Sequence, residues 1–305
     1  MAPIRRAIAS TGLEVFPVNL GGTPFGRSAD RQQAFEVLDA YRSAGGNFLD
    51  TADGYADGAS ESVIGAWLTS RAAHDEFVIA TKVGKHSQLP GLRRENILAA
   101  VDASLRRLGR DRIDVYYAHY DDESVPLADV AGTFSSLVDA GKIVSIGVSN
   151  FRAQRVEEWL RIAQDEHLHA PVAIQPHYNL VERAYEGELG AVAAKQGLAV
   201  MPYWALASGF LAGVVRNAAQ AEKHSEFASR YLGERGDRVL GALDTAASNH
   251  HVTQSTVALA WLIAQPTVTA PVAGARTPEQ VAGLVEAATL DLTPEELDAL
   301  SAASR

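Results

Sequence analysis

One strand, one loop and the start of one helix lie within Asn47-Phe48-Leu49-Asp50-Thr51-Ala52-Asp53-Gly54-Tyr55-Ala56-Asp57-Gly58-Ala59-Ser60-Glu61. The apolar run that ends at Asp50 is typical of a short buried strand. A loop with two glycines follows, and a helical pattern begins at Ser60, which we expect to be the N-cap. The loop carries Asp50 and Tyr55, an acid and a phenol that could share one site. Taken alone, the pair is explained equally well by a turn-capping Asp50 and a packing Tyr55.

The same unit recurs along the chain. We predict seven further strands, each followed by helical sequence, at residues 15–20, 77–81, 113–118, 143–148, 172–174, 198–202 and 268–272. These strands are continuous apolar runs, as expected when both faces of a sheet are buried. Repeated strand–helix units favour a parallel sheet, and eight of them in a 305-residue chain favour a closed (β/α)8 TIM barrel.

Both ends of the chain add to this repeat. Residues 5–14 predict an N-terminal β-hairpin that turns at Ser10-Thr11-Gly12. Towards the C-terminus, helices are predicted at residues 237–248, 254–265 and 278–288, and a last helix begins at Thr293-Pro294, so that the C-terminal part has extra helices beyond one for each strand. The charged residues 215–235 are predicted to form a loop.

A single domain over residues 1–305 is expected, because no linker is rich enough in Pro and Ser to mark a boundary. The rival fold is an open sheet that binds a dinucleotide at a Gly-x-Gly-x-x-Gly turn. Gly21, Gly22 and Gly26 have the wrong spacing for that turn, which favours the barrel.

Composition limits the partners. The net charge of −10 and the pI of about 5.4 argue against nucleic acid or an anionic membrane. The absence of cysteine excludes disulfides, cysteine zinc sites and thiol catalysis. Residues 1–10 lack the apolar core of a signal peptide, and no apolar run approaches the roughly 20 residues of a membrane span. We therefore expect a cytoplasmic protein that acts on a small molecule.

Polar or small residues follow nearly every predicted strand. They are Gly22 and Thr23, Asp50, Lys82, His119, Ser149 and Asn150, Gln175, Tyr203, and Gly274 with Arg276. In a (β/α)8 barrel these strand ends meet at one rim, where active sites are built. A whole ring of such residues is difficult to explain as turn formers alone.

Four residues of this rim could perform one reaction. A phenol such as Tyr55 has a pKa of about 10, and a nearby ammonium such as Lys82 favours its phenolate. Asp50 could hold Lys82 in place, and neutral His119 could orient a substrate oxygen. The set has no nucleophile and no metal, and it suits addition of a hydride from a cofactor to a carbonyl group.

The rim residues lie in motifs spread in order over almost the whole chain. Besides residues 47–61 they are Ala80-Thr81-Lys82, Tyr116-Tyr117-Ala118-His119, Gly147-Val148-Ser149-Asn150-Phe151, Ile174-Gln175-Pro176-His177-Tyr178-Asn179-Leu180, Gly209-Phe210-Leu211-Ala212-Gly213 and Gly274-Ala275-Arg276-Thr277-Pro278. Any one motif is weak, but the ordered set resembles the aldo-keto reductase family.

The resemblance implies a barrel that binds an extended nicotinamide dinucleotide. It implies Tyr55 as the general acid, completed by Asp50, Lys82 and His119. The cofactor contacts that it implies are Gly22, Thr23 and Asp50 beside the nicotinamide, Ser149, Asn150 and Gln175 on its carboxamide, Tyr203 stacked on its ring, Leu206 and Ser208 near the pyrophosphate, and Gly274, Arg276 and Gln280 at the adenosine. Rim residues expected to line the substrate pocket, together with Tyr55 and His119, are Phe25, His86, Tyr120 and Trp204.

Some positions depart from the family pattern. Tyr120-Asp121-Asp122 stands where x-Pro-Asp is common, and Trp204-Ala205-Leu206 replaces Ser-Pro-Leu. Gly283-Leu284 replaces a Glu-Asn pair that usually contacts the adenosine. Arg276 could pair with a 2′-phosphate or stack on adenine, so NADP(H) is preferred and NAD(H) stays possible.

Two other functions are considered. One is an NADP(H)-binding sensor or accessory subunit with little turnover, and the other is a barrel hydrolase or isomerase. The sequence leaves the natural carbonyl compound, the direction of the reaction and the oligomeric state open.

Overall fold

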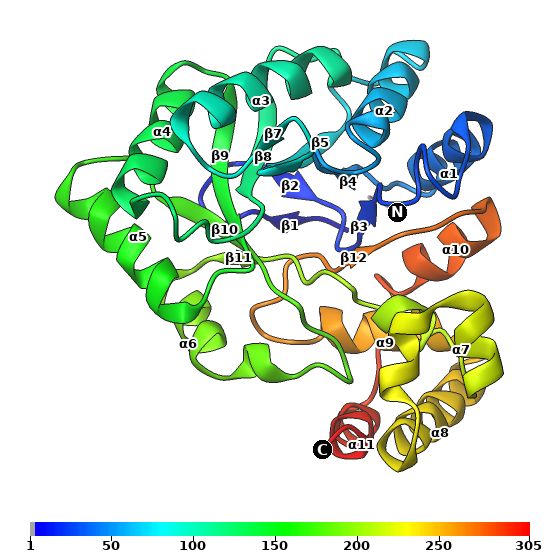
Figure 1. Ribbon diagram of the computed structural model, residues 1–305. Helices are drawn as coiled ribbons and strands as arrows, with labels where there is room; N and C mark the ends of the chain where they lie inside the picture. Colours follow the sequence, from blue (N-terminus) through cyan, green and yellow to red (C-terminus); the bar gives the residue numbers. More distant parts are fainter. Residues whose placement is uncertain (1–3) are drawn as a thin grey trace.

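Eight parallel strands form a closed barrel in the computed structural model, which describes residues 4–305 (Figure 1). Their bounds are β3 (Asn19–Gly21), β4 (Phe48–Asp50), β5 (Val78–Val83), β8 (Ile113–Ala118), β9 (Ile143–Ser149), β10 (Pro171–Gln175), β11 (Ala199–Val200) and β12 (Val272–Ala273). Each strand pairs with the next from β3 to β11, and β12 pairs with β3. The ring closes where the amide of Val272 donates to the carbonyl oxygen of Pro202 at 2.8 Å. The predicted (β/α)8 barrel is confirmed.

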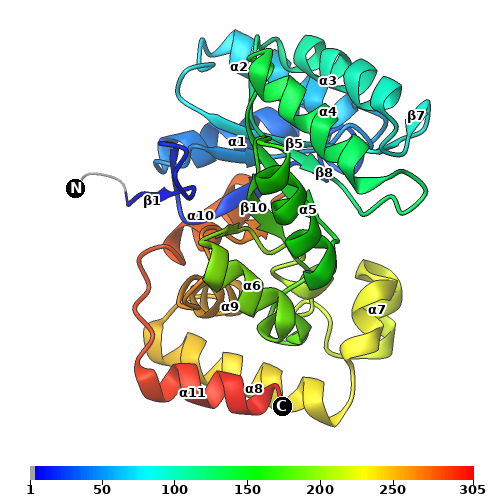
Figure 2. The ribbon, with the colours of Figure 1, turned by 90° about the vertical axis from the view of Figure 1, so that its left-hand side faces the viewer.

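Helices surround the barrel, as Figure 1 shows. They are α1 (Arg31–Ser43), α2 (Ala59–Ser70), α3 (Arg94–Leu108), α4 (Leu127–Asp139), α5 (Ala153–Asp165), α6 (Glu188–Gln196), α9 (Gln254–Ile263) and α10 (Pro278–Glu286). The predicted extra helices are α8 (Glu234–His250) and α11 (Pro294–Ala303), which lie side by side in Figure 2. Within residues 4–305 we find no helix that has both the length and the apolar character needed to cross a membrane.

An antiparallel hairpin of β1 (Arg6–Ala7) and β2 (Glu14–Val15) precedes the barrel, as predicted. Val15 is the second hairpin strand rather than the start of the first barrel strand, which begins at Asn19, so that predicted boundary is wrong. Ile8 and Val15 are fully buried and belong to the same apolar cluster as the inward side chains of the barrel. The hairpin therefore closes the end of the barrel where the strands begin. Figure 2 shows it on the side opposite β7 and α7.

Several other boundaries differ from the prediction. The segment 215–235 contains α7 (Ala218–His224) and the 3-10 helix η3 (Glu226–Tyr231). The last strand lies at Val272–Ala273 and overlaps the predicted residues 268–272 only at Val272. A small hairpin of β6 (Lys85–His86) and β7 (Leu89–Pro90) follows β5 and was not predicted.

Ser60 is not the N-cap of α2. The cap is Gly58, whose φ of 86° is left-handed, and Ser60 lies inside the helix. Its hydroxyl is buried and donates to the carbonyl oxygen of Gly22 at 2.8 Å. This hydrogen bond joins α2 to the loop after β3. The hydroxyl of Ser60 thus bonds to a residue distant in sequence instead of to the backbone amide of its own helix, which a cap residue would use.

Candidate active site

An ion pair between Lys82 and Asp50 lies at the centre of the rim. Lys82 Nζ is 2.5 Å from Asp50 Oδ1, and their side chains are 0% and 2% exposed. The ammonium also donates to the carbonyl oxygen of Thr51 at 2.7 Å and to the hydroxyl of Tyr55 at 3.4 Å. Gln175 Nε2 donates to the other oxygen of Asp50 at 2.7 Å. Burying two charges is costly, and these bonds offset much of that cost.

Neighbouring charges keep Lys82 protonated. Burial alone would lower the pKa of Lys82, but the charges of Asp50 and Tyr55 outweigh it and raise the pKa above its ordinary value. The side chain of Lys82 is therefore held as an ammonium beside the Tyr55 hydroxyl. Such a charge stabilises negative charge that develops on the phenol oxygen.

His119 completes the group at the end of β8. Its ring meets the ring of Tyr55 edge-on, with centroids 5.9 Å apart. Burial, helped by the charges of Lys82 and Lys85, lowers the pKa of His119 to about 2. The imidazole is therefore neutral, and it can donate one N–H to a substrate oxygen without carrying a charge. The structure brings the four predicted residues Asp50, Tyr55, Lys82 and His119 together.

A second group of predicted residues forms the neighbouring part of the rim. The Tyr203 hydroxyl donates to Asn150 Oδ1 at 2.8 Å, and Asn150 Nδ2 donates to the carbonyl oxygen of His119 at 2.9 Å. Ser149 Oγ donates to the carbonyl oxygen of Gln175 at 3.1 Å. These bonds fix the ring of Tyr203 beside the first group.

His177, which our sequence analysis did not single out, packs against Tyr203. The two rings are stacked, with centroids 5.2 Å apart and planes at 13°. The sequence could have indicated this residue, because His177 lies two residues after the end of β10 and the other rim residues also lie at or just after strand ends.

Gly22 and Thr23 follow β3 at the same end. A side chain at Gly22 would place its Cβ 2.8 Å from Ser60 Oγ, so only glycine fits there. The amide of Gly22 donates to the carbonyl oxygen of Asp50 at 2.7 Å. Thr23 is exposed on the rim, whereas Phe25 is fully buried in the core. Phe25 was expected to line the substrate pocket. That role stays a prediction, although the side chain of Phe25 has no exposed surface.

The residues expected at the far end of a dinucleotide are more exposed. Gly274, Arg276 and Gln280 are open to solvent, and Gln280 Oε1 accepts from the backbone amide of Arg276 at 2.8 Å. Within residues 4–305, the guanidinium of Arg276 makes no ion pair. Leu206 and Ser208 are half-buried, and Ser208 has a left-handed φ of 55°.

Two exposed aromatic side chains border the rim. Trp204 and Phe227 are 39% and 59% exposed, and their ring centroids are 5.4 Å apart. Trp204 also meets the ring of His177 edge-on at 5.2 Å. Phe227, which lies in η3 and far from Trp204 in sequence, was not among the predicted pocket residues. His86 and Tyr120 are half-buried on the rim loops.

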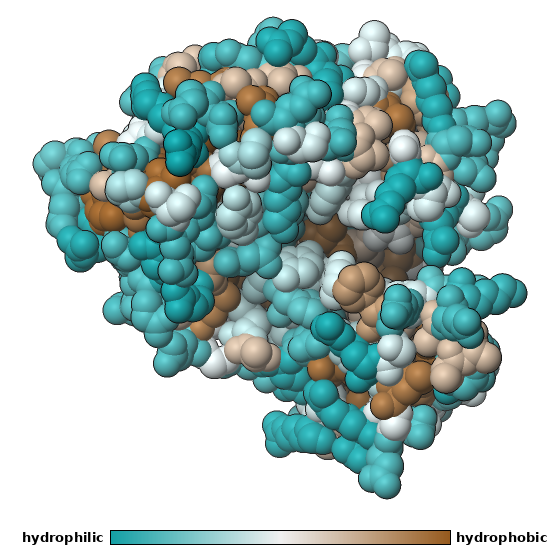
Figure 3. Space-filling view, in the orientation of Figure 1, coloured by the Kyte–Doolittle hydropathy of each residue, from teal (hydrophilic) through white to brown (hydrophobic). Residues whose placement is uncertain are grey.

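These side chains suit a nicotinamide dinucleotide. The amides of Asn150 and Gln175 can meet a carboxamide, the ring of Tyr203 offers a flat surface, and the exposed guanidinium of Arg276 can meet a phosphate. Figure 3 shows this face of the molecule, which is hollowed near its centre. No cluster of three or more His, Asp or Glu side chains that could hold a metal occurs among residues 4–305.

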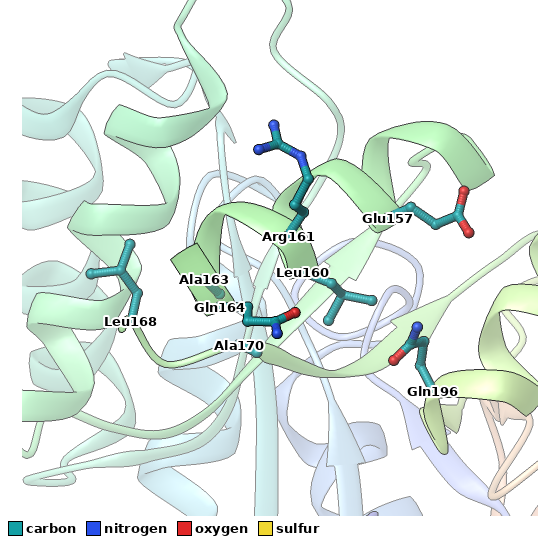
Figure 4. A pocket seen from close by; sticks show the side chains of 8 residues that line it. All are labelled: Glu157, Leu160, Arg161, Ala163, Gln164, Leu168, Ala170 and Gln196. Carbon is teal, nitrogen blue, oxygen red and sulfur yellow. The ribbon is translucent and has the colours of Figure 1, made fainter. Parts of the chain in front are cut away.

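A separate hollow of about 440 Å³ lies between α5 and α6 (Figure 4). Leu160, Ala163, Ala170 and Gln196 line it, among others. Ala170 directly precedes β10, so this hollow is at the end of the barrel opposite Lys82 and Tyr55. We therefore do not assign the chemistry to it.

Several proteins are similar to this chain in sequence over most of its length. The family model described as Aldo/keto reductase family matches residues 17–305. Norsolorinic acid reductase of Emericella nidulans is 31% identical, over 94% of this chain and 77% of that protein. An aryl-alcohol dehydrogenase of Phanerodontia chrysosporium whose name specifies NADP(+) is 28% identical, over 97% of this chain and 84% of that protein. A probable voltage-gated potassium channel subunit beta of Oryza sativa subsp. japonica is 30% identical, over 97% of this chain and 94% of that protein.

Proposed function

Because the chain belongs to the aldo-keto reductase family of NAD(P)H-dependent oxidoreductases, we propose that it reduces aldehydes or ketones to alcohols with NADPH and Tyr55 as proton donor. One observation carries this proposal. A buried ammonium, Lys82, contacts both Asp50 and the Tyr55 hydroxyl at the strand ends of the barrel.

Each residue of the group has a separate part in the reaction. Tyr55 gives its hydroxyl proton to the carbonyl oxygen as negative charge develops there. Lys82 stabilises the resulting phenolate, and Asp50 holds Lys82 in place. Neutral His119 orients the carbonyl oxygen by a hydrogen bond. The nicotinamide, when bound, supplies the hydride.

Substrates with an aromatic ring suit the rim best. The exposed pair Trp204 and Phe227 offers flat apolar surface beside Tyr203. Aromatic pairs contribute about 0.5–1.5 kcal/mol beyond the burial of their area. One of the similar proteins is also named for aryl alcohols, which carry an aromatic ring.

The test of the function is turnover. The protein is mixed with NADPH and either benzaldehyde or hexanal, and cofactor absorbance is followed. We expect consumption of NADPH with both aldehydes and a higher kcat/KM for benzaldehyde. Absence of turnover with a panel of reactive aldehydes and ketones would contradict the proposal.

Arg276 provides the test of cofactor preference. Arg276→Ala is expected to raise the KM for NADPH about 10- to 100-fold, since a charge-assisted bond to a 2′-phosphate contributes about 1.5–3 kcal/mol. The KM for NADH, which lacks that phosphate, should change little. Steady-state kinetics with both cofactors measure the difference, and Arg161→Ala on the outer face of α5 is the matched control. Equal changes for both cofactors would argue against the 2′-phosphate contact.

A second candidate function is an NADP(H)-binding accessory subunit with little turnover. The similarity to the rice protein named as a channel beta subunit favours it. NADPH affinity in the micromolar range or tighter, together with negligible turnover of every carbonyl compound tried, would select this function over the first.

A further inference from the structure

A second buried acid lies beneath the catalytic group and takes no part in the mechanism above. Asp53 is 0% exposed, and it accepts one hydrogen bond, from the backbone amide of Gly84 to Oδ2 at 3.1 Å. Its other oxygen, Oδ1, has no hydrogen-bond partner among residues 4–305. Asp50 has an ammonium partner, but Asp53 makes no ion pair in this part of the chain. An unpaired buried carboxylate costs stability, so stability does not explain why an acid stands here.

Asp53 joins the loop that carries Tyr55 to the end of β5. The backbone amide of Asp53 donates to the carbonyl oxygen of Lys82 at 3.0 Å, and its carboxylate reaches Gly84 on the other side of that strand end. Next to it, a Cβ at Gly54 would lie 2.7 Å from the carbonyl oxygen of Lys85. Residues 53 and 54 therefore pack closely against residues 82–85. We call residues 53–55 the Tyr55 loop.

This contact sets the distance on which the chemistry depends. Tyr55 belongs to the loop and Lys82 to the strand, and 3.4 Å separates the Tyr55 hydroxyl from Lys82 Nζ. Asp53 bonds to the backbone of Lys82, the strand residue that supplies the ammonium, and to Gly84, two residues further along the chain. A loosened Tyr55 loop would let the phenol move away from that ammonium.

Charged and titratable groups face Asp53 from several elements. They are Glu61 on α2, Lys85 and His86 on β6, Tyr116 on β8 and Tyr120 just after β8. Burial and, less strongly, the charge of Glu61 raise the pKa of Asp53, whereas the backbone amides of Gly84 and Gly54 and the charge of His86 lower it, and the net result is a pKa of about 6. Asp53 therefore changes charge within the pH range in which enzymes are assayed.

We propose that Asp53 is a positioning residue whose carboxylate fastens the Tyr55 loop to the end of β5, and that carbonyl reduction slows when this carboxylate takes up a proton. The inference rests on the proposed function, because Tyr55 must be the proton donor for the rate to respond. The fastening itself can be measured without turnover.

Three variants test the rate. Asp53→Ala removes the acceptor for Gly84, and we expect kcat at pH 7.5 to fall about tenfold with an unchanged KM for NADPH. Asp53→Asn keeps an acceptor oxygen but removes the charge, as protonation of Asp53 does, and we expect its kcat at pH 7.5 to fall about threefold, to the level of the protonated wild-type protein. Wild-type kcat should fall as the pH drops through about 6, and this acid limb should disappear in Asp53→Asn. Since imidazoles commonly titrate nearby, His86→Gln identifies the group, because the limb should persist in it.

Two rate outcomes would overturn the inference. The first is an unchanged kcat in Asp53→Ala at pH 7.5, and the second is an acid limb that persists in Asp53→Asn. Thermal unfolding of each variant is measured in parallel, so that a folding defect is not read as a positioning effect.

Amide hydrogen exchange tests the fastening directly. The amides of Gly84 and Tyr55 should exchange about tenfold faster in Asp53→Ala than in the wild-type protein. Wild-type protein at pH 5 should also exchange faster than at pH 7.5 once intrinsic chemical exchange is corrected. Unchanged protection of Gly84 would overturn the inference whether or not the protein turns over. Absence of all carbonyl reduction with Asp53-dependent protection would instead mean that the proposed function fails while the fastening stands.

Discussion

Tyr55→Phe is expected to lower kcat for carbonyl reduction by about 10²- to 10⁴-fold, the range that a positioned general acid contributes. The ring and its edge-on contact with His119 remain, and only the hydroxyl near Lys82 is lost. The KM for NADPH should therefore change little. Steady-state and single-turnover rates with benzaldehyde measure the effect on the chemical step.

Tyr185→Phe is the matched control for this change. The Tyr185 hydroxyl is bonded to Thr267 at 2.8 Å, far from the four residues of the proposed site. Its loss should leave kcat near the wild-type value. Undiminished turnover by Tyr55→Phe would remove Tyr55 from the mechanism.

Lys82→Met is expected to lower kcat at least about 10²-fold and to destabilise the protein by about 3–5 kcal/mol, the cost of breaking a buried ion pair. Methionine fills much of the same space, but Asp50 stays as a buried charge with Gln175 as its remaining side-chain partner. Rate and stability should therefore both fall. Kinetics and chemical denaturation measure the two effects.

A double variant separates the two effects. Lys82→Met with Asp50→Asn removes both charges, so the free energy of unfolding should recover while kcat stays low. Lys142→Met is the control, because Lys142 pairs with Asp102 on the surface and exposed pairs contribute about 0–1 kcal/mol. Recovery of activity in the double variant would show that the ammonium is dispensable.

Asp53→Asn is expected to raise the free energy of unfolding at pH 7 by about 1–3 kcal/mol, since each unit of pKa shift corresponds to about 1.4 kcal/mol. The folded-state pKa of about 6 exceeds the ordinary value of 3.8, so the native state holds this proton more tightly than the unfolded state. The contribution of Asp53 to stability therefore falls as the pH rises from about 4 to 6 and stays low above that range. Denaturation at pH 4.5 and pH 7 measures the change.

Asp111→Asn serves as the comparison for that measurement, because Asp111 is exposed. It should leave both the stability and its pH dependence near those of the wild-type protein. A less stable Asp53→Asn variant with the wild-type pH dependence would contradict the expected cost of burying the charge.

The sequence was sufficient to predict the barrel and the composition of its rim. Buried parallel strands are continuous apolar runs, and each such strand places its last residues at the same end of the barrel. These two rules were enough to predict that Asp50, Lys82 and His119 lie close to one another, and they do so in the structure. The roles of these residues remain proposals.

Contacts between distant segments could not be predicted in the same way. Ser60 has the residue type of a cap, but its hydroxyl bonds to Gly22, which is remote in sequence. Phe227 lies in a segment that reads as a polar loop, and its contact with Trp204 exists only after η3 packs against the rim. Asp53 reads as a turn residue, because its hydrogen bond with Gly84, just after β5, joins segments that are distant in sequence.

The hairpin of β1 and β2 makes the two ends of the barrel different, because it covers only one of them. It covers the end of the barrel opposite β7 and α7, so a chain tethered to a solid support near Arg6 would direct the opening of the proposed site toward the solution. Immobilised enzyme attached in this orientation should retain the turnover of the free enzyme. Attachment through a cysteine introduced at Phe227 should obstruct substrate entry.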